Sequence, residues 1–330
     1  MAYTAIADLI KHDAFAQYFT QAMLERSTLF KSGIATADPT IARKCAEAGF
    51  GGEFVSLPFF NSLDVSDGHA EQTLAEGTDL VPDKVTASED RAVIIRRGKA
   101  FGANDLAADV AGADPMRVVA EQFADWWNAR NQKRLMSVLA GVFARNVASD
   151  DSSLVLDISG EEGEAAILSK DTIMLAAQLL GDRKLDLTAV AMHSMVETFL
   201  ASMDTNAGLY RASDAAATLP KYNGRDVIVD DNCGYNPSTK VVELYLFGRG
   251  AVAYNPCPVK VPFEADRNPL INGGQDYVVS RTANICHLRG YKWNSASANP
   301  DNSALATGSN WAKVYDVKDI RCVKLIAKIG

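Results

Sequence analysis

Residues 114–147, DPMRVVAEQFADWWNARNQKRLMSVLAGVFARNV, carry the strongest structural signal in the chain. Asp114 is a candidate N-cap and Pro115 suits the first helical position. Apolar side chains then recur at spacings of three and four residues, with no interruption before Gly141. The pattern predicts one helix of about 45 Å, longer than a small domain is wide. Because the heptad is irregular, we expect the helix to run along a flat, elongated molecule rather than in a coiled coil.

Two segments upstream of this helix predict extensions from the body of the protein. Residues 5–28 have an amphipathic helical pattern with no apolar partner nearby in sequence, which predicts an arm. Residues 53–60 and Arg91–Phe101 resemble two strands, and the intervening residues 61–90 are polar and rich in turn formers. A long polar excursion between two strands predicts an extended hairpin with a function, and a disordered surface loop is the alternative.

Downstream, helical and strand patterns alternate and then give way to strands. Helices are predicted at 168–180, with Gly181 as the stop, and at 193–203, on either side of a buried strand at 187–192. Tyr222–Asn223–Gly224 is a turn signal. The later strands are predicted at 226–230, 241–247, 251–254, 277–281 and 320–329. We expect 251–254 to pair back on 241–247 across a tight turn at Gly248–Arg249–Gly250, and the fold to be α+β with a discontinuous domain.

Composition restricts the class of protein. The chain has 330 residues, of which 48% are hydrophobic and 22% charged, as in a folded protein. The sequence predicts neither a signal peptide nor a membrane span, which favours folding in the cytoplasm. The formal net charge of −8 argues against tight binding of nucleic acid through phosphate contacts. A shell that encloses DNA without binding it is compatible with this net charge, because a mildly acidic wall repels the polyanion.

No catalytic motif is present. The sequence has no Walker A, GxGxxG, HExxH or GxSxG pattern. His193 and Ser194 are neighbours at a predicted strand–helix junction, where a local cap is favoured over a catalytic pair. Asp230 and Asp231 are expected to accept backbone hydrogen bonds in a turn, with a metal-binding pair as the alternative. We predict no catalytic, cofactor-binding or metal-binding residues and no enzyme activity.

Two charged groups are candidates for structural contacts. Glu264, Asp266 and Arg267 are interpreted as an ion-pair cluster. In the basic run at 96–99, strand alternation places Arg97 and Lys99 on one face, which is either a solvated edge or a salt-bridge contact to another subunit.

Five cysteines are widely spaced and form no CxxC pair. They are interpreted as buried thiols, with cross-links between neighbouring subunits in an oxidising environment as the alternative. The five are Cys45, Cys233, Cys257, Cys286 and Cys322.

An ordered series of segments resembles the major capsid proteins of tailed bacteriophages. The series begins at VSLPFF (55–60), continues through the Ala100–Ala107 step, the Asp-Pro helix with Trp126–Trp127, LTAVAMHS (187–194) and Pro220–Asp231, and includes VVELYLFGRGAVAY (241–254). It then runs through Glu264–Arg267, Gly273–Asp276 and Arg281 to HLRGYKW (287–293). No single motif decides the matter, but the order is specific from about residue 50 onward.

The resemblance implies the Hong Kong 97-type capsid fold. It implies an N-terminal arm at 1–51, an extended loop at 52–101, a peripheral domain with a long spine helix at 102–184 plus 311–330, and an axial domain at 185–310. Some relatives join a loop lysine to a distant asparagine. Lys84 and Lys99 lie in the corresponding region, but neither the partner nor the required acid can be identified in this sequence.

The resemblance also implies a function. The expected protein self-assembles into pentamers and hexamers of an icosahedral head shell that encloses double-stranded DNA without sequence-specific binding. Portal and scaffolding proteins are expected partners, a decoration protein is a further candidate, and no membrane is involved. The location is the virion, after assembly in the host bacterial cytoplasm. An encapsulin-like compartment that encloses cargo proteins is the alternative.

Overall fold

The computed structural model describes residues 34–61, 63, 71–72, 79–105, 115–203, 209–210, 221–270 and 274–330. The predicted helical arm at 5–28, the candidate N-cap Asp114 and much of the tip of the extended loop lie outside these residues.

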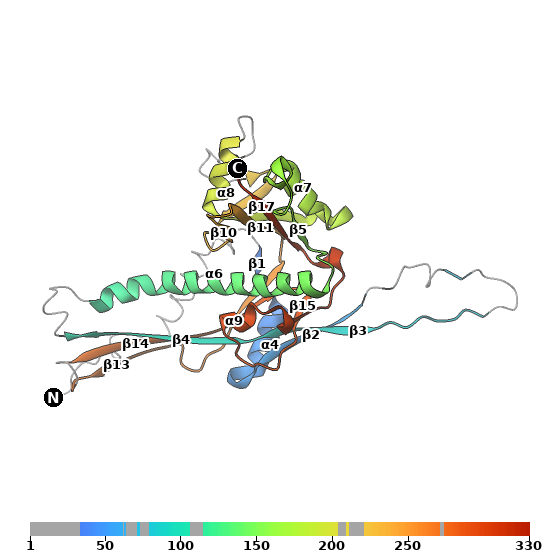
Figure 1. The fold of residues 1–330 in the computed structure, drawn as a ribbon. Helices are drawn as coiled ribbons and strands as arrows, with labels where there is room; N and C mark the ends of the chain where they lie inside the picture. The colour runs from blue at the N-terminus through green and yellow to red at the C-terminus, as the bar shows by residue number, and fades with distance from the viewer. Residues whose placement is uncertain are drawn as a thin grey trace.

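The long helix α6 (Pro115–Ser149) is the axis of the molecule and confirms the prediction of an overlong helix. Its 35 residues span about 52 Å, and it lies along one face of an elongated sheet (Figure 1). Its C-terminal half buries apolar side chains at three- and four-residue spacing. These are Leu135, Val138, Leu139, Val142 and Phe143. Arg134, itself buried, donates to Asn284 Oδ1 at 2.7 Å and so fixes the helix to the sheet.

A five-stranded sheet runs beneath α6. Its strands are β1 (Ala35–Thr36), β4 (Ile95–Asn104), β12 (Val252–Cys257), β13 (Phe263–Asn268) and β14 (Gln275–Leu288). The long β14 pairs with β12, β13 and β4. The strand predicted at 277–281 is confirmed as part of β14, which extends beyond it at both ends. The alternating pattern is hidden because one end of β14 is buried on both faces.

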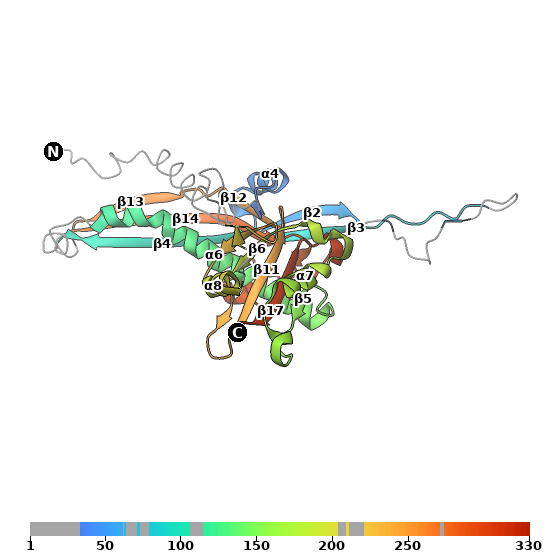
Figure 2. The ribbon, with the colours of Figure 1, turned by 90° about the horizontal axis from the view of Figure 1, so that it is seen from above.

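The extended hairpin is confirmed, with different strand bounds. β2 (Phe54–Phe60) pairs antiparallel with β3 (Ala87–Val93), and the hairpin projects from the body (Figures 1 and 2). The single strand predicted at 91–101 is divided at Ile94, whose N–H donates to Glu53 O at 2.9 Å. On one side of Ile94 the chain pairs with β2, and on the other side β4 pairs with β14.

An eight-stranded sheet forms the upper part of the molecule in Figure 1. Its strands are β5 (Val155–Asp157), β6 (Leu187–Met192), β7 (Leu209–Tyr210), β8 (Lys221–Tyr222), β9 (Arg225–Val229), β10 (Tyr235–Asn236), β11 (Val241–Gly248) and β17 (Cys322–Lys328). Helices α7 (Lys170–Gln178) and α8 (Ser194–Met203) belong to the same part. The predicted turn between β8 and β9 is present, with positive φ at both Asn223 and Gly224.

The predicted hairpin of 241–247 with 251–254 is wrong. Residues 248–250 do turn, and Gly250 has a φ of 67°. However, β11 has β17 on one side and β6 on the other, so no edge is free for the returning chain. The chain therefore passes into the other sheet, where β12 pairs with β14 and β1. A local turn signal cannot distinguish these two courses.

The two sheets share one continuous core. Residues of α6, of the five-stranded sheet (Val252, Leu288) and of the eight-stranded sheet (Val190, Leu244) belong to the same buried cluster. The remaining elements pack against this body. They are α4 (Pro39–Ala48), β15 (Tyr291–Trp293), α9 (Asn302–Leu305) and β16 (Trp311–Lys313).

Two further observations concern the division of the chain into an arm and domains. Residues 34–51, which the sequence placed in the arm, include β1 and α4 and contact β12 of the same chain. The final strand β17 lies next to β11 over seven residue pairs, so divisions at 185 and 310 would separate two hydrogen-bonded strands.

Among the described helices, none has a stretch long and apolar enough to cross a membrane.

Candidate assembly interfaces

The root of the extended hairpin is fixed by a buried contact between a carboxylate and an imidazole. Asp90 of β3 and His287 of β14 are each 1% exposed, and Asp90 Oδ1 lies 2.8 Å from His287 Nε2. Asp90 Oδ2 accepts from the Gly290 N–H at 3.2 Å. Burial alone would raise the pKa of Asp90, but His287 and the Gly290 N–H together lower it below its usual value. The carboxylate is therefore ionised, and the hairpin leaves the body at a fixed point.

Two arginines reinforce this root from either side. Arg91 Nε donates to Trp293 O at 2.7 Å, and its guanidinium lies 4.9 Å from the centre of the Phe54 ring. Arg289 donates to Asp38 Oδ2 at 2.8 Å and so ties α4 to the end of β14. Further along β2, the Phe59 ring packs edge-on against Tyr315, with ring centres 4.8 Å apart.

The hairpin exposes a set of large apolar side chains. They are Phe60 (79% exposed), Leu63 (71%), Leu80 (62%), Val81 (69%) and Val85 (61%). Such side chains are rarely left in water together on an isolated folded subunit, so this surface is suited to being covered by another molecule. A groove of about 730 Å³ adjoins the hairpin, lined among others by Phe60, Arg249, Tyr315 and Arg321.

The eight-stranded part exposes a second apolar surface. Met174 and Leu175 of α7 are 49% and 60% exposed, and Leu185 nearby is 82% exposed. The helix itself is well formed, because Ser169 and Thr172 make a reciprocal capping box. The exposed side chains are thus held on a rigid element, as an interface requires.

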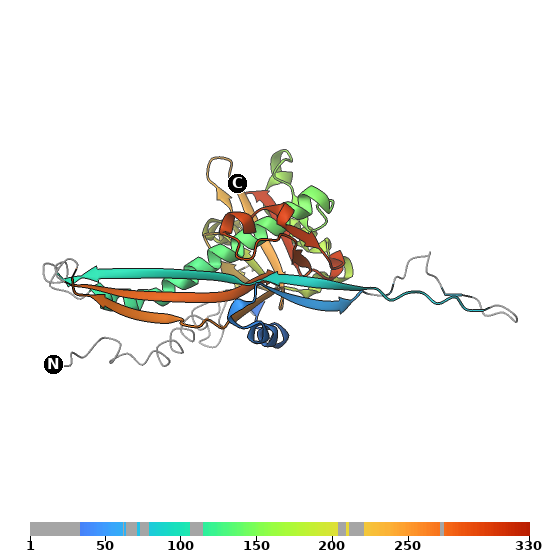
Figure 3. The ribbon, with the colours of Figure 1, turned by 90° about the horizontal axis from the view of Figure 1, so that it is seen from below.

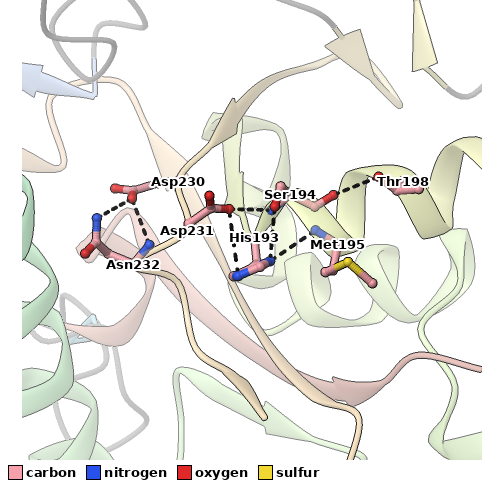
Figure 4. Close-up of polar contacts among 7 residues, drawn as sticks. All are labelled: His193, Ser194, Met195, Thr198, Asp230, Asp231 and Asn232. Atoms are coloured by element: carbon pink, nitrogen blue, oxygen red, sulfur yellow. Dashed lines mark hydrogen bonds and ion pairs between the residues drawn. The ribbon is translucent and has the colours of Figure 1, made fainter. Parts of the chain in front are cut away.

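His193, Ser194 and Asp231 are brought together, but as a cap (Figure 4). His193 Nδ1 accepts from the Met195 N–H at 3.0 Å, and Asp231 Oδ1 accepts from the Ser194 N–H at 3.3 Å. The Nδ1 lone pair is therefore occupied and cannot take a proton from Ser194 Oγ, 3.4 Å away. The three residues close the N-terminus of α8, as predicted for His193 and Ser194.

Asp230 forms the turn that was predicted. Its Oδ1 accepts from the Asn232 N–H at 2.9 Å and from the Asn232 side chain at 2.6 Å. Within the described residues, no cluster of three or more His, Cys, Asp or Glu side chains is placed to hold a metal ion.

The predicted ion-pair cluster at 264–267 is wrong in its partners. Arg267 contacts Asp276 at 3.0 Å and Asp105 at 2.5 Å, whereas Glu264 pairs with Arg281 at 2.9 Å. Strand alternation separates Arg267 from Glu264 and Asp266, so neighbouring strands supply its acids. The predicted common face of Arg97 and Lys99 is the face of β4 that is turned toward α6. Lys99 Nζ lies 6.0 Å from the centre of the Trp126 ring, on the α6 side.

The cysteines differ from the expectation of five thiols. Cys45 of α4 and Cys257 of β12 form a disulfide within the chain, with their Cα atoms 5.4 Å apart. Cys233, Cys286 and Cys322 are free and buried. Burial raises the pKa of Cys233 and of Cys286 to about 12. None of these three thiols reaches the surface, where a neighbouring subunit could meet it.

Several of these contacts have no signal in the sequence. Asp90 and His287 are 197 residues apart, and each is an ordinary polar residue of a strand. The one available hint is that His287 stands in an otherwise apolar stretch, NICHL.

Solved structures with a similar fold include phage capsids. The fold is similar to the capsid of Ralstonia phage GP4, with a TM-score of 0.56, 10% identity, and coverage of 91% of this chain and 88% of that chain. It is also similar to a capsid subunit of cyanophage Pam1, with a TM-score of 0.51, 10% identity, and coverage of 84% and 85%. At this identity the likeness shows the fold alone. The long helix, projecting hairpin and two sheets thus define the Hong Kong 97-like capsid fold.

Sequence comparison gives the family. The family described as "Gp13-like: Major capsid protein 13-like" matches residues 15–323. The major capsid protein of Bacillus phage SPP1 is 37% identical over 330 residues, which cover 98% of each chain. The chain belongs to the Gp13-like family of major capsid proteins. It is a structural subunit of a phage head shell, as the resemblance predicted, and its location is the virion.

Proposed function

We propose that this capsid protein assembles into pentamers and hexamers that close an icosahedral shell around double-stranded DNA. The observation that carries the proposal is the projecting hairpin β2–β3 and its loop (Figure 1), on which Phe60, Leu63, Leu80, Val81 and Val85 are 61% to 79% exposed. A neighbouring copy would cover these side chains. Each contact is modest, but every subunit makes several, so the shell gains by multivalency.

The DNA would be held by confinement rather than by recognition. The net charge of −8 supports this, because a wall that bound phosphate tightly would be basic overall. The charge also permits sliding of the packed polyanion along the wall. No residue of the chain is proposed to read base sequence.

The proposal includes partners and a place of assembly. A separate scaffolding protein would direct shell curvature, a portal would occupy one vertex, and a decoration protein is a further candidate. Assembly would take place in the host bacterial cytoplasm. The protein would have no enzyme activity, which agrees with the capping role of His193, Ser194 and Asp231.

We also propose a division into two units. The eight-stranded sheet with α7 and α8 would form the axial unit, at the centre of each capsomer. The five-stranded sheet with α6 would form the peripheral unit. Strand pairing supports this version over boundaries at 185 and 310, because it keeps β17 with β11 and β12 with β14.

Electron microscopy of the purified protein tests the proposal. We expect closed shells or sheets of capsomers with five and six subunits. A sharply defined monomer by light scattering, with no particles on concentration, would refute it. Small uniform cages containing cargo proteins would instead favour a nanocompartment.

A further inference from the structure

Helix α4 is held on the five-stranded sheet by few side chains of its own. It lies on the face turned away from α6, below the sheet in Figure 1 and in blue in Figure 3. Of its ten residues only Ile41 and Cys45 are buried, one turn apart on the same face. Both belong to a small apolar cluster that is distinct from the main core. A helix with so little buried surface depends on other contacts to stay in place.

The two ends of α4 are attached to β12 in different ways. At its start, Asp38 N donates to Asn255 Oδ1 at 3.1 Å, and Asn255 Nδ2 donates to Asp38 O at 3.0 Å. In its second half, Cys45 is joined to Cys257, and their Cα atoms are 5.4 Å apart, a separation at which two thiols can be oxidised without backbone movement. The first attachment forms as the chain folds, whereas the second also requires an oxidant.

The position of α4 affects the root of the extended hairpin. Residues 49–53 are all that separates α4 from β2 in the chain. Lys44 Nζ of α4 also donates to Ser56 O, within β2. Movement of the second half of α4 would therefore displace the first strand of the hairpin, and a bond that fixes α4 would fix that strand as well.

The five cysteines differ in how readily an oxidant reaches them. Cys257 is partly exposed, whereas Cys45 is 1% exposed. Burial raises the pKa of Cys233 and of Cys286 to about 12, so these two hold almost no thiolate, which is the form that reacts. Oxidation would therefore begin at Cys257 and be completed by Cys45.

We propose that Cys45 and Cys257 form a redox lock: they are thiols while the protein is in the host cytoplasm and become a disulfide once the finished particle reaches an oxidising medium. The reductants of the cytoplasm keep thiols free, whereas extracellular media favour disulfides. The timing rests on the proposed function, because it assumes assembly in the cytoplasm. The lock fixes α4 and the hairpin root after the shell has been built, and leaves both free to adjust before.

The oxidant is a low-molecular-weight disulfide, RSSR. The Cys257 thiolate attacks one sulfur of RSSR, the S–S bond breaks, and one RSH leaves with the proton that Cys257 has lost. The Cys45 thiolate then attacks the Cys257 sulfur of this mixed disulfide, and the second RSH leaves with the proton of Cys45. Two protein thiols are oxidised to one disulfide, and RSSR is reduced to two RSH.

Thiol trapping tests the timing. Bacteria that produce the protein are quenched with acid, and the thiols of the denatured chain are alkylated with N-ethylmaleimide before peptide mapping. We expect Cys45 and Cys257 to be alkylated in these cells, and to be linked to each other in released particles treated with oxidised glutathione. A linked pair already present in the quenched cells, or two thiols that survive the oxidant, would overturn the inference.

Failure of the proposed function would be recognised separately. The bond lies within one chain, so its formation can be followed on the unassembled subunit as well as on particles. Absence of shells under the electron microscope would count against the proposed function, whereas the state of the two thiols is measured in either case.

Hydrogen exchange of the unassembled subunit tests the lock itself. Amides of α4 should exchange about tenfold more slowly in the oxidised wild-type subunit than in the reduced one, because the bond opposes local opening. Amides of α7, in the eight-stranded part, should exchange equally in both states. Equal exchange of α4 in the two states would show that the bond locks nothing.

Cys257→Ser is the matched control for the oxidant. The change is at a partly exposed position, and circular dichroism verifies that the variant remains folded. Oxidised glutathione should leave the exchange of α4 in this variant unchanged. Slower exchange in the variant would mean that the oxidant acts elsewhere in the chain, and the inference would fail.

Discussion

Replacing Gly141 of α6 by alanine should destabilise the subunit, although alanine is the better helix former. In an exposed helix interior this change stabilises by about 1 kcal/mol. Gly141, however, is the point at which α6 approaches the segment that carries α9 and β16. A Cβ atom built there lies 2.0 Å from Leu305 O and 2.6 Å from Trp311 Nε1. The first of these atoms is backbone and cannot move aside without displacing its segment.

The size of the loss in stability follows from the atoms that must move to make room for the new Cβ atom. Moving the Leu305 segment outward disrupts a buried hydrogen bond, which Trp311 Nε1 donates to Leu305 O at 2.8 Å. Loss of such a bond costs about 1–3 kcal/mol. Overpacking of a core costs about as much again. After subtraction of the gain in helix propensity, we expect a net loss of about 3 kcal/mol in the free energy of unfolding.

Urea unfolding of the unassembled subunit measures this loss. Tryptophan fluorescence reports on the site directly, because Trp311 packs edge-on against Trp293 with ring centres 5.1 Å apart. Ala140→Gly, at the exposed position next in sequence, is the matched control and should cost about 1 kcal/mol from propensity alone. If Gly141→Ala leaves stability unchanged or raises it, the close approach of α6 to this segment is wrong.

Three further predictions concern the hairpin and the disulfide. Asp90→Asn should lower the free energy of unfolding by about 3 kcal/mol, because His287 loses a buried charged partner. Since the pKa of Asp90 is lowered from 3.8, the difference from wild type should be full above that pH and shrink as pH falls further, which urea titrations at several pH values would detect. An unchanged midpoint would show that the contact contributes nothing. Phe60→Ser should leave the stability of the unassembled subunit within ~0.5 kcal/mol, as for other surface changes, yet reduce shell formation seen by light scattering; normal assembly would mean that this side chain stays in water. Non-reducing peptide mapping of purified particles should link Cys45 to Cys257 within one chain and give a single monomer band, whereas a ladder of multimers would contradict the assignment.

Local features of this fold could be predicted from the sequence. Helix α6 follows from its apolar spacing, and the β8–β9 turn follows from Asn223–Gly224. Each depends on residues within a few positions of one another. The projecting hairpin was also predicted, because two strand patterns flank a long polar stretch.

Strand partners could not be predicted in the same way. β4 and β14 are separated by about half of the chain, and the residues joined by the Cys45–Cys257 disulfide are 212 positions apart. A strand pattern indicates which face is buried but not which edge is adjacent. The turn at Gly248–Arg249–Gly250 illustrates the limit, since its residues fit both a hairpin and a passage between sheets.

The continuous core between the two sheets has a mechanical consequence. The chain passes between the sheets at residues 249–251, and α6 packs against both, so the two parts cannot tilt independently without opening a close-packed interior. Stiffness would thereby be concentrated in the body, and compliance in the projecting hairpin. A shell built from such units would absorb differences in local curvature as elastic bending of this thin extension. Its bodies would behave as rigid tiles, so internal pressure would be resisted by tension in the connecting strands rather than by deformation of the tiles.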